Sequence, residues 1–529
     1  MTKGSARTIV SSTLIVGLEV HVELATRTKM FSRALNPAFS AAGEAEPNSF
    51  IDPVVLALPG ALPVINRRAV ELAVKVGLGL GCKIASTTKW DRKSYFYPDL
   101  PKSYQISQYD LPVCFDGVVD LPGIDEKGFF VLDDSAEAVV PPCRVGIIRA
   151  HLEEDAGKLM HEAPGGAAID FSIADYNRAG APLLEIVTQP DFRTADQVVA
   201  FARILRNICR FLGVSEGVMQ KGHMRFEPNI NCRLTLDDGT TAVTPIVEIK
   251  NLNSFRSLKG AIEFEAAEQP RRWLEDGREM GRGMKITRGW DDVRGVTYVQ
   301  REKEDAHDYR YFPDPDLLPL SIPPSWVEEA AGSVPELPLP RLRRYVSDFG
   351  LGIKEATALV DERDTCFLYE HAIIAMIEQG VERTRAGKLA ANFLLQSGLK
   401  RANERGVHVH ELGITAQAIA TIGSLRERGE LSAAGADELF GLVCEPGQHG
   451  RDVRQLAADK GLLIVRDDAA VEKWIDQVLA ANAAIADQVR SGKVQAVGRL
   501  VGETMKLAGG SADAKTVREL ILKKLGVAG

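Results

Sequence analysis

A stretch of alternating polar and apolar residues near the start of the chain places the strongest constraint on its fold. It runs from residue 14 to residue 24 and reads LIVGLEVHVEL. Because side chains alternate sides along a β-strand, this stretch predicts a strand with one apolar face against a core and one polar face. The polar face carries Gly17, Glu19, His21 and Glu23, and the apolar face carries Leu18, Val20, Val22 and Leu24. Such a strand can hold a metal ion on one side.

Four later stretches repeat this pattern, at residues 149–155, 183–187, 223–233 and 247–251. Their agreement favours an antiparallel sheet with one packed face and one open face, because fully covered parallel sheets lack the alternation. The polar members are Arg149, His151, Glu153, Asp155, Glu185, His223, Arg225, Glu227, Asn229, Asn231, Arg233, Glu248 and Lys250. Glu154 faces the other side of its strand. We expect an open face rich in carboxylates, imidazoles, amides and cations.

Composition limits the class of protein. A chain of 529 residues predicts two to four domains, and a net charge of -8 excludes an overall basic field that would attract nucleic acid. The seven cysteines form no C-x-x-C pair, which argues against a zinc ribbon or a disulfide framework and favours the reducing cytoplasm. Residues 1–7 lack the apolar core of a signal peptide, and the apolar segment 54–65 is short and contains two prolines. We therefore expect no membrane attachment.

Periodicity divides the chain into a strand-rich part and a helical part. Helical spacing predicts helices over residues 67–80, 195–212 and 258–273, and the chain from 131 to 249 is otherwise mostly strand. The glycine-rich run 77–82 follows a helix, so we interpret it as a helix end and not as a nucleotide loop. Beyond Leu320 the pattern is helical, with a proline-rich hinge at 335–340 and a clear break at Gly509 and Gly510.

Three local segments suggest contacts with anions or packing partners. Residues 89–108 interleave aromatic, basic and proline residues, which is typical either of an anchored surface loop or of a loop that faces phosphate. Residues 301–316 are strongly charged but end in Tyr309, Tyr311 and Phe312, so we expect this loop to pack against something. Residues 491–529 hold seven Lys or Arg against three Asp or Glu, a local charge of +4 where a polyanion could bind.

The residue types on the polar strand faces favour one chemistry. Carboxylates and imidazoles suit Mg²⁺ or Mn²⁺ better than zinc. Such an ion would bridge ATP phosphates while Arg225, Arg233 and Lys250 neutralise negative charge. No Walker A motif occurs, which leaves a sheet-borne site that activates a carboxylate as an acyl phosphate for attack by an amine. Alternatively, each polar residue is part of a solvated strand face, and Asn229 and Asn231 form hydrogen bonds across strands.

Long motifs recur along almost the whole chain, at residues 17–24, 58–66, 92–102, 151–158, 175–185, 248–255 and 304–313, with shorter ones at 489–493 and 501–506. Together they resemble GatB, the B subunit of the tRNA-dependent aspartyl/glutamyl-tRNA amidotransferase GatCAB, and its YqeY-like tail. The resemblance implies an α+β fold: a glutamine-synthetase-like antiparallel-sheet cradle over residues 1–320, a helical domain over 321–400 and a YqeY-like helical, tRNA-binding tail over 401–529.

The resemblance also implies an activity. A GatB chain uses ATP and Mg²⁺ to phosphorylate the side chain of Glu-tRNA(Gln) or Asp-tRNA(Asn), and ammonia then gives Gln-tRNA(Gln) or Asn-tRNA(Asn). The ammonia comes through a channel from glutamine hydrolysis in the A subunit of a heterotrimer that includes a small C subunit. The expected class is a glutamine-hydrolysing carbon–nitrogen ligase of the cytoplasm. Which tRNA is preferred depends on the synthetases that coexist with it.

Residue roles follow from these motifs together with the charges of the polar strand faces. The expected catalytic residues are Glu19, His21, Glu153, Glu154 and Glu185. The expected ATP-binding residues are Arg92, Lys93, Arg225, Arg233, Lys250 and Asn251, and the expected metal ligands are Glu19, His21, Glu153 and Glu227. Many family members carry a four-cysteine zinc knuckle where this chain has residues 31–34 and 52–55, so we expect no zinc here. Glu227 replaces a family aspartate, which moves the carboxylate outward by one methylene.

Two other classes of protein remain open at this point. A stand-alone ATP-dependent carboxylate–amine ligase would share the cradle but would not need a helical extension with a basic end. A non-catalytic tRNA-binding scaffold would not need dense polar strand faces. The archaeal relative GatE has an additional inserted domain before its tail, and the interval after Pro340 is too short for one.

Overall fold

The computed structural model describes residues 8–37, 45–132, 137–163, 166–281, 284–302, 309–464, 468–491, 493–508, 512 and 514–527. The chain divides into two compact units, Met1–Leu339 and Pro340–Gly529. The predicted break at Gly509 and Gly510, and residues 303–308 of the predicted charged loop, lie outside the described residues.

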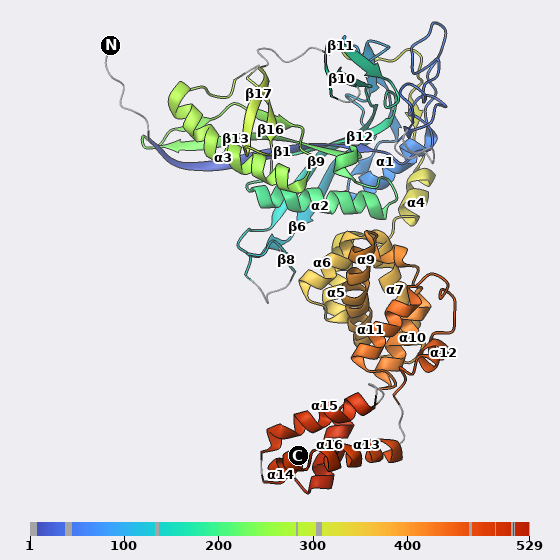
Figure 1. Cartoon of the computed structure of the whole chain (residues 1–529). Coiled ribbons are helices and arrows are strands. Elements are labelled where there is room, and N and C mark those ends of the chain that lie inside the picture. Colours follow the sequence, from blue (N-terminus) through green and yellow to red (C-terminus); the bar gives the residue numbers. More distant parts are fainter. Residues whose placement is uncertain are drawn as a thin grey trace. The chain divides into compact units, whose positions relative to one another are not determined.

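A ten-stranded sheet organises the first unit (Figure 1). The strand order is β17-β16-β15-β13-β1-β12-β9-β6-β2, and β14 pairs with β13. The bounds are β1 Ile9–Glu23, β2 Lys83–Ile84, β6 Cys114–Leu121, β9 Cys143–Glu154, β12 Pro182–Thr188, β13 Met224–Leu236, β14 Thr241–Val243, β15 Val247–Lys250, β16 Ile286–Asp291 and β17 Val296–Glu302. Only the pair β15 and β16 is parallel among these strands. The five predicted strands are therefore neighbours in one sheet.

The register of the central strands aligns their polar residues in a row. His21 on β1 lies opposite Glu185 on β12 and Arg225 on β13. Glu185 in turn lies opposite His151 on β9. Because paired residues in a sheet point to the same face, these four side chains stand side by side across four strands. The apolar residues of the first predicted strand are at most 1% exposed, which confirms the predicted assignment of the two faces: Leu18, Val20, Val22 and Leu24.

Three helices of the first unit pack on the apolar face of the sheet (Figure 1). They are α1 (Arg67–Gly79), α2 (Ala195–Phe211) and α3 (Phe255–Asp276), which confirms the three predicted helices. Each begins after a residue whose side chain accepts a hydrogen bond from a free backbone N–H of the first turn, namely Asn66, Thr194 and Ser254. Helix α3 ends at Gly277, whose φ of 64° suits a residue without a Cβ.

Smaller sheets accompany the ten-stranded sheet. Strand β4 (Asp91–Ser94) pairs with β5 (Tyr104–Ser107) and with β18 (Phe312–Pro313). This pairing joins the aromatic and basic loop at 89–108 to the end of the charged loop near residue 312, so the expected packing of that loop is confirmed. The remaining small sheets are β3 (Thr87–Thr88) with β19 (Leu320–Ser321), β7 (Gly123–Ile124) with β8 (Phe130–Val131), and β10 (Lys158–Glu162) with β11 (Ala168–Asp175). Helix α4 spans Pro324–Gly332.

The second unit is built from helices, as the sequence pattern predicts. Its α-helices are α5 Pro338–Phe349, α6 Ile353–Asp361, α7 Arg363–Glu378, α8 Arg383–Asn392, α9 Leu399–Arg405, α10 Ala416–Glu427, α11 Ala433–Val443, α12 Val453–Asp459, α13 Asp468–Ala481, α14 Ala483–Arg490, α15 Val497–Leu507 and α16 Ala514–Leu525. A π-helical segment, Phe393–Gly398, joins α8 to α9. The division into 321–400 and 401–529 stays a prediction, and α9 continues across residue 400. Within the described part of the chain, no helix has the length and apolar character that crossing a bilayer requires.

Candidate active site

A cavity of about 540 Å³ lies over the polar face of the sheet. Its wall includes residues of β1, β9, β12, β13 and β15 and of the loops that carry β4 and β18. This volume falls within the usual range for sites that bind small molecules. The wall is rich in charge, because it collects residues from the polar faces of five strands.

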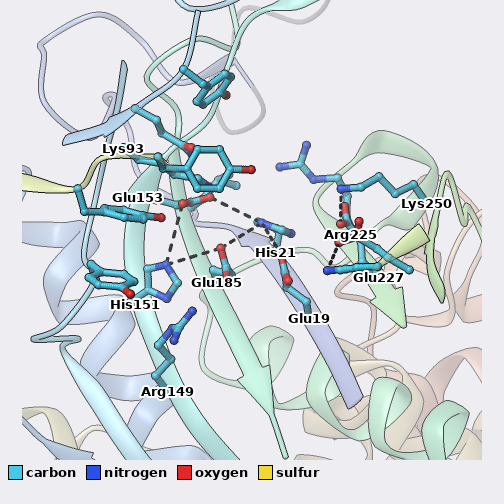
Figure 2. A pocket seen from close by; sticks show the side chains of 18 of the residues that line it. Glu19, His21, Lys93, Arg149, His151, Glu153, Glu185, Arg225, Glu227 and Lys250 are labelled. Atoms are coloured by element: carbon cyan, nitrogen blue, oxygen red, sulfur yellow. Dashed lines mark hydrogen bonds and ion pairs between the residues drawn. The ribbon is translucent and has the colours of Figure 1, made fainter. Parts of the chain in front are cut away.

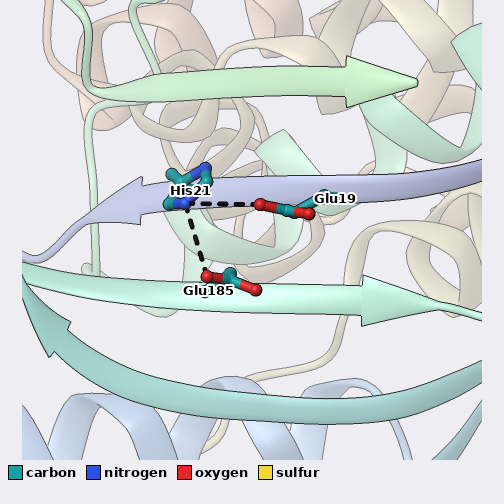
Figure 3. A group of neighbouring side chains, drawn as sticks. All are labelled: Glu19, His21 and Glu185. Atoms are coloured by element: carbon teal, nitrogen blue, oxygen red, sulfur yellow. Dashed lines mark ion pairs between the residues drawn. The ribbon is translucent and has the colours of Figure 1, made fainter. Parts of the chain in front are cut away.

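His21 stands at the centre of this cavity (Figure 2). Its Nε2 atom lies 3.5 Å from Glu185 Oε2, 3.6 Å from Glu153 Oε1 and 3.8 Å from Glu19 Oε1. Figure 3 shows that Glu19 comes from the same strand, whereas Glu185 comes from the neighbouring strand. On the next strand, His151 Nε2 lies 3.6 Å from the same Glu185 Oε2. One carboxylate therefore stands between two imidazoles.

The protonation states of His21, Glu185 and Glu19 depend on one another. Burial alone would lower the pKa of His21, but the hydrogen bond and negative charge of Glu185 and the charge of Glu227 raise it to about 9. Burial alone would raise the pKa of Glu185, but His151 and His21 hold it well below its usual value. Glu19 has a pKa of about 7, raised first by burial and then by the nearby Glu185. Strongly perturbed groups gathered in a cavity are typical of functional sites.

Two overlapping sets of side chains have the geometry of a metal site. Glu19, His21 and Glu185 form one set, and His151, Glu153 and Glu185 form the other, with the ligand atoms of each within 4.8 Å of one another. The Nδ1 atoms of His21 and His151 are buried and have no hydrogen-bond partner among the described residues. Hard carboxylate oxygens with imidazole nitrogens suit Mg²⁺ or Mn²⁺. The residues present therefore fit a divalent cation, and Glu185 belongs to both sets.

Cations stand on both sides of this acidic centre. Lys250 Nζ lies 2.7 Å from Glu227 Oε2, and Lys285 Nζ lies 2.9 Å from Glu248 Oε1. On the other side of His21, Figure 2 shows Lys93 beside Glu153. Burial would lower the pKa of Lys93, but Glu153 and its neighbours raise it, so this lysine stays charged. The cavity can therefore neutralise an anionic ligand in more than one place.

Eight of the predicted site residues lie in the cavity wall, namely Glu19, His21, Lys93, Glu153, Glu185, Arg225, Glu227 and Lys250. Glu227 reaches the wall, where it pairs with Lys250, and it belongs to neither of the two metal-ligand sets found among the described residues, so its role as a ligand stays a prediction.

Four predicted site residues lie outside the cavity wall. Glu154 points to the opposite face of β9, where it accepts hydrogen bonds from Lys102 and from the backbone N–H of Ile106. Arg92 is held by Asp314 and Asp316 at 2.8 and 2.9 Å. Arg233 is exposed farther along β13, and Asn251 is exposed just after β15. The predicted catalytic role of Glu154 and the predicted ATP contacts of the other three therefore have no support from their positions.

Sequence reasoning missed part of the wall. Tyr95, Tyr109, Tyr309 and Tyr311 line the cavity, and the interpretation of the two loops treated their aromatic residues only as packing groups. For Tyr95, Tyr309 and Tyr311 the signal was present in the aromatic density of residues 89–108 and 309–312, whereas Tyr109 lies one residue beyond the first of these stretches. Lys285 also lines the cavity, but it precedes β16 in a segment without a recognisable pattern. Its position depends on the parallel pairing of β15 with β16.

The fold and site together define a class: an α+β protein with a sheet-borne polar cavity suited to a divalent cation and phosphate. Comparison with known proteins narrows this class. Residues 14–328 match the GatB/GatE catalytic domain family, and residues 375–525 match the GatB domain family. The B subunit of the aspartyl/glutamyl-tRNA(Asn/Gln) amidotransferase from Moorella thermoacetica is 40% identical over 512 residues, which cover 97% of this chain and 99% of the relative. Its counterpart from Corynebacterium diphtheriae is 42% identical over 519 residues, covering 97% and 96%.

The chain therefore belongs to the family of aspartyl/glutamyl-tRNA(Asn/Gln) amidotransferase B subunits. This membership confirms the predicted role as an amidotransferase subunit and the predicted enzyme class, a carbon–nitrogen ligase. It also confirms the predicted α+β fold followed by helical parts. A stand-alone ligase and a non-catalytic scaffold are correspondingly disfavoured.

Proposed function

We propose that this chain activates and amidates the amino acid carried by a misacylated tRNA. The γ-phosphoryl group of ATP is transferred to the side-chain carboxylate of Glu-tRNA(Gln) or Asp-tRNA(Asn), which gives an acyl phosphate and ADP. Ammonia then attacks the acyl carbon, phosphate leaves, and the amide of Gln-tRNA(Gln) or Asn-tRNA(Asn) remains. The observation that supports this best is the row His151, Glu185, His21 and Arg225 across four strands beneath one cavity.

Different side chains of the wall take part in different steps of this reaction. Lys250, Lys285 and Arg225 lie on one side of His21 and would bind phosphate oxygens, exchanging their present carboxylate partners for the ligand. Phosphoryl transfer depends mainly on position and on neutralisation of negative charge, which such cations supply. Lys93 stays charged on the other side, where the carboxylate of the acceptor must approach.

A divalent cation would be held by Glu19, His21, Glu153, His151 and Glu185, with Glu185 common to both sets of ligands. When bound, Mg²⁺ or Mn²⁺ supplies Lewis-acid stabilisation of the phosphate oxygens. Glu185 positions both imidazoles through contacts of 3.5 and 3.6 Å. Tertiary packing thus holds the ligand set in place before any ligand arrives, which lowers the cost of binding.

The other parts of the proposed enzyme follow from the family. A glutaminase A subunit supplies ammonia, and a small C subunit completes a heterotrimer. The helical second unit binds the tRNA through its basic residues between 491 and 529. A chain with a net negative charge needs such a locally positive region to bind a polyanion. The complex would bind its tRNA substrates in the cytoplasm.

The test is to co-purify the full chain with its A and C subunits and to measure amide formation on both misacylated tRNAs. We expect ATP-dependent product with at least one of them and none with free glutamate or aspartate. Equal activity with the free amino acid would indicate a stand-alone ligase. Full activity after Glu19→Ala or His21→Ala would instead indicate a scaffold whose catalysis resides elsewhere.

Removal of divalent cations should abolish the activity of this complex. Chelation with EDTA is expected to stop both ADP release and amide formation, and addition of Mg²⁺ or Mn²⁺ should restore them, because uncompensated phosphate charge would remain in the cavity. Binding of Mn²⁺ to the intact complex, followed by electron paramagnetic resonance, gives a readout separate from turnover. Wild-type complex should bind Mn²⁺, and His21→Ala complex should bind it at least roughly tenfold more weakly. Activity that persists after complete chelation would contradict the proposed metal site.

A further inference from the structure

Four tyrosines form one side of the cavity and have no assigned task in the chemistry above. We call Tyr95, Tyr109, Tyr309 and Tyr311 the tyrosine wall. The rings of Tyr109 and Tyr311 are stacked, with centroids 4.3 Å apart and planes 12° from parallel. Tyr309 contacts both Tyr311 and Tyr95 edge to face, with centroid distances of 6.1 and 6.2 Å. Tyr109 is 54% exposed, so aromatic surface remains accessible to a ligand.

The tyrosine wall lies at the Lys93 end of the cavity. Lys93 Nζ is 5.2 Å from the ring centroid of Tyr309. In Figure 2, Lys93 and Glu153 lie on one side of His21, whereas Arg225, Glu227 and Lys250 lie on the other. The cavity therefore has two ends, separated by the acidic centre at which the phosphoryl group would be transferred.

The two ends differ in the ligand that they suit. The end beside Lys250 combines the cations Lys250, Lys285 and Arg225 with the apolar side chains of Ile246, Met280 and Met284. A triphosphate carries most of the charge that enters the cavity, so its place is among these cations, with its base against the apolar side chains. The Lys93 end offers two cations, Lys93 and Arg149, beside an aromatic surface. A planar base gains stacking energy on such a surface whatever its sequence context.

The reaction brings two adenosines to this cavity, since the aminoacyl group of a charged tRNA is esterified to a terminal adenosine. We propose that the tyrosine wall is the stacking platform for this terminal adenosine, and that the adenine of ATP binds at the opposite, Lys250 end. The inference rests on the proposed function and assigns each nucleoside to one end. The acyl carboxylate and the γ-phosphate then meet from opposite sides at the acidic centre, as an in-line transfer requires.

The experiment uses the full chain co-purified with its A and C subunits. Tyr109→Ala and Tyr311→Ala complexes are compared with Tyr109→Phe and Tyr311→Phe, which keep the stacking ring. Tyr298→Ala is the matched control, since Tyr298 is a 44% exposed tyrosine of the same unit outside the cavity wall. The KM for misacylated tRNA should rise about tenfold in the alanine variants and less than about twofold in the phenylalanine variants and the control. The KM for ATP should stay within about twofold of wild type in all of them.

A spectroscopic readout separates stacking from a general loss of structure. Misacylated tRNA whose terminal adenine is replaced by 2-aminopurine should lose fluorescence when it binds wild-type complex, and should keep most of it on Tyr109→Ala complex at saturation. Thermal melting identifies any alanine variant that fails to fold. At that position the phenylalanine variant, which keeps the ring, is compared with the wild type instead. A rise in the KM for ATP alone would place the adenine of ATP on the wall and overturn the assignment, as would unchanged KM values for both substrates. Failure of wild-type complex to form amide would instead contradict the proposed function itself.

Discussion

Replacement of Glu185 by glutamine is expected to lower the rate of amide formation by about 10³-fold, which corresponds to about 4 kcal/mol of transition-state stabilisation. Glu185 is the only residue that belongs to both metal-ligand sets found in the described part of the chain. Its carboxylate also lies within 3.6 Å of both His21 Nε2 and His151 Nε2. The amide of glutamine keeps the shape but removes the charge that holds these two imidazoles and the cation together.

The measurement is the initial rate of amide formation by the full complex, together with ADP release and Mn²⁺ binding. All three should fall, because the loss acts on phosphoryl transfer and not on a later step. Glu162→Gln is a suitable control, since Glu162 is an exposed carboxylate on β10 outside the cavity wall. Less than about a tenfold loss with normal Mn²⁺ binding would show that Glu185 is not a shared ligand.

Glu265→Ala is expected to lower the free energy of unfolding of the first unit by about 3 to 5 kcal/mol. Glu265 on α3 has no exposed surface, and its carboxylate receives hydrogen bonds from Arg272 at 2.8 Å and from Thr297 at 2.5 Å. Arg288 lies 3.4 Å from the same oxygen. Removal of the carboxylate leaves these cations partly buried without their countercharge, which costs more than the pair itself contributes. The cluster also fastens α3 to β16 and β17 at the edge of the sheet.

Urea denaturation followed by tryptophan fluorescence measures this effect, because Trp90, Trp273, Trp290 and Trp326 lie in the first unit and only Trp474 lies in the second. Glu263→Ala on the same helix is the matched control. Glu263 is largely exposed and lies 3.7 Å from Lys259, so its loss should change stability by less than about 0.5 kcal/mol. Equal urea midpoints for Glu265→Ala and Glu263→Ala would contradict a structural role for the buried cluster around Glu265.

The alternation of polar and apolar residues predicted the two faces of β1 between Leu18 and Val22, although it did not predict that Glu23 on the polar face is also buried. Leu18 and Val20 pack in the core, and Glu19 and His21 face the cavity, as the period of two requires. The same holds for α1, α2 and α3, whose spacing and N-cap residues are local features of the chain. Alternation also predicted that Glu154 faces away from Glu153, although motif matching placed it in the site. The role of the chain came from its long family motifs and not from any single pattern.

Only the tertiary structure decided which polar residues meet. Alternation assigns a residue to a face of its strand, but strand order and register depend on packing between segments far apart in the chain. His21 and Glu185 are neighbours because β1 pairs with β12. The register of β1 with β13 places Arg225 opposite His21 but Arg233 opposite Thr13, away from the site. The tyrosine wall likewise forms because β4 pairs with β18 and brings two distant loops together. Local backbone geometry thus determined the faces, whereas long-range packing of the sheet determined the site.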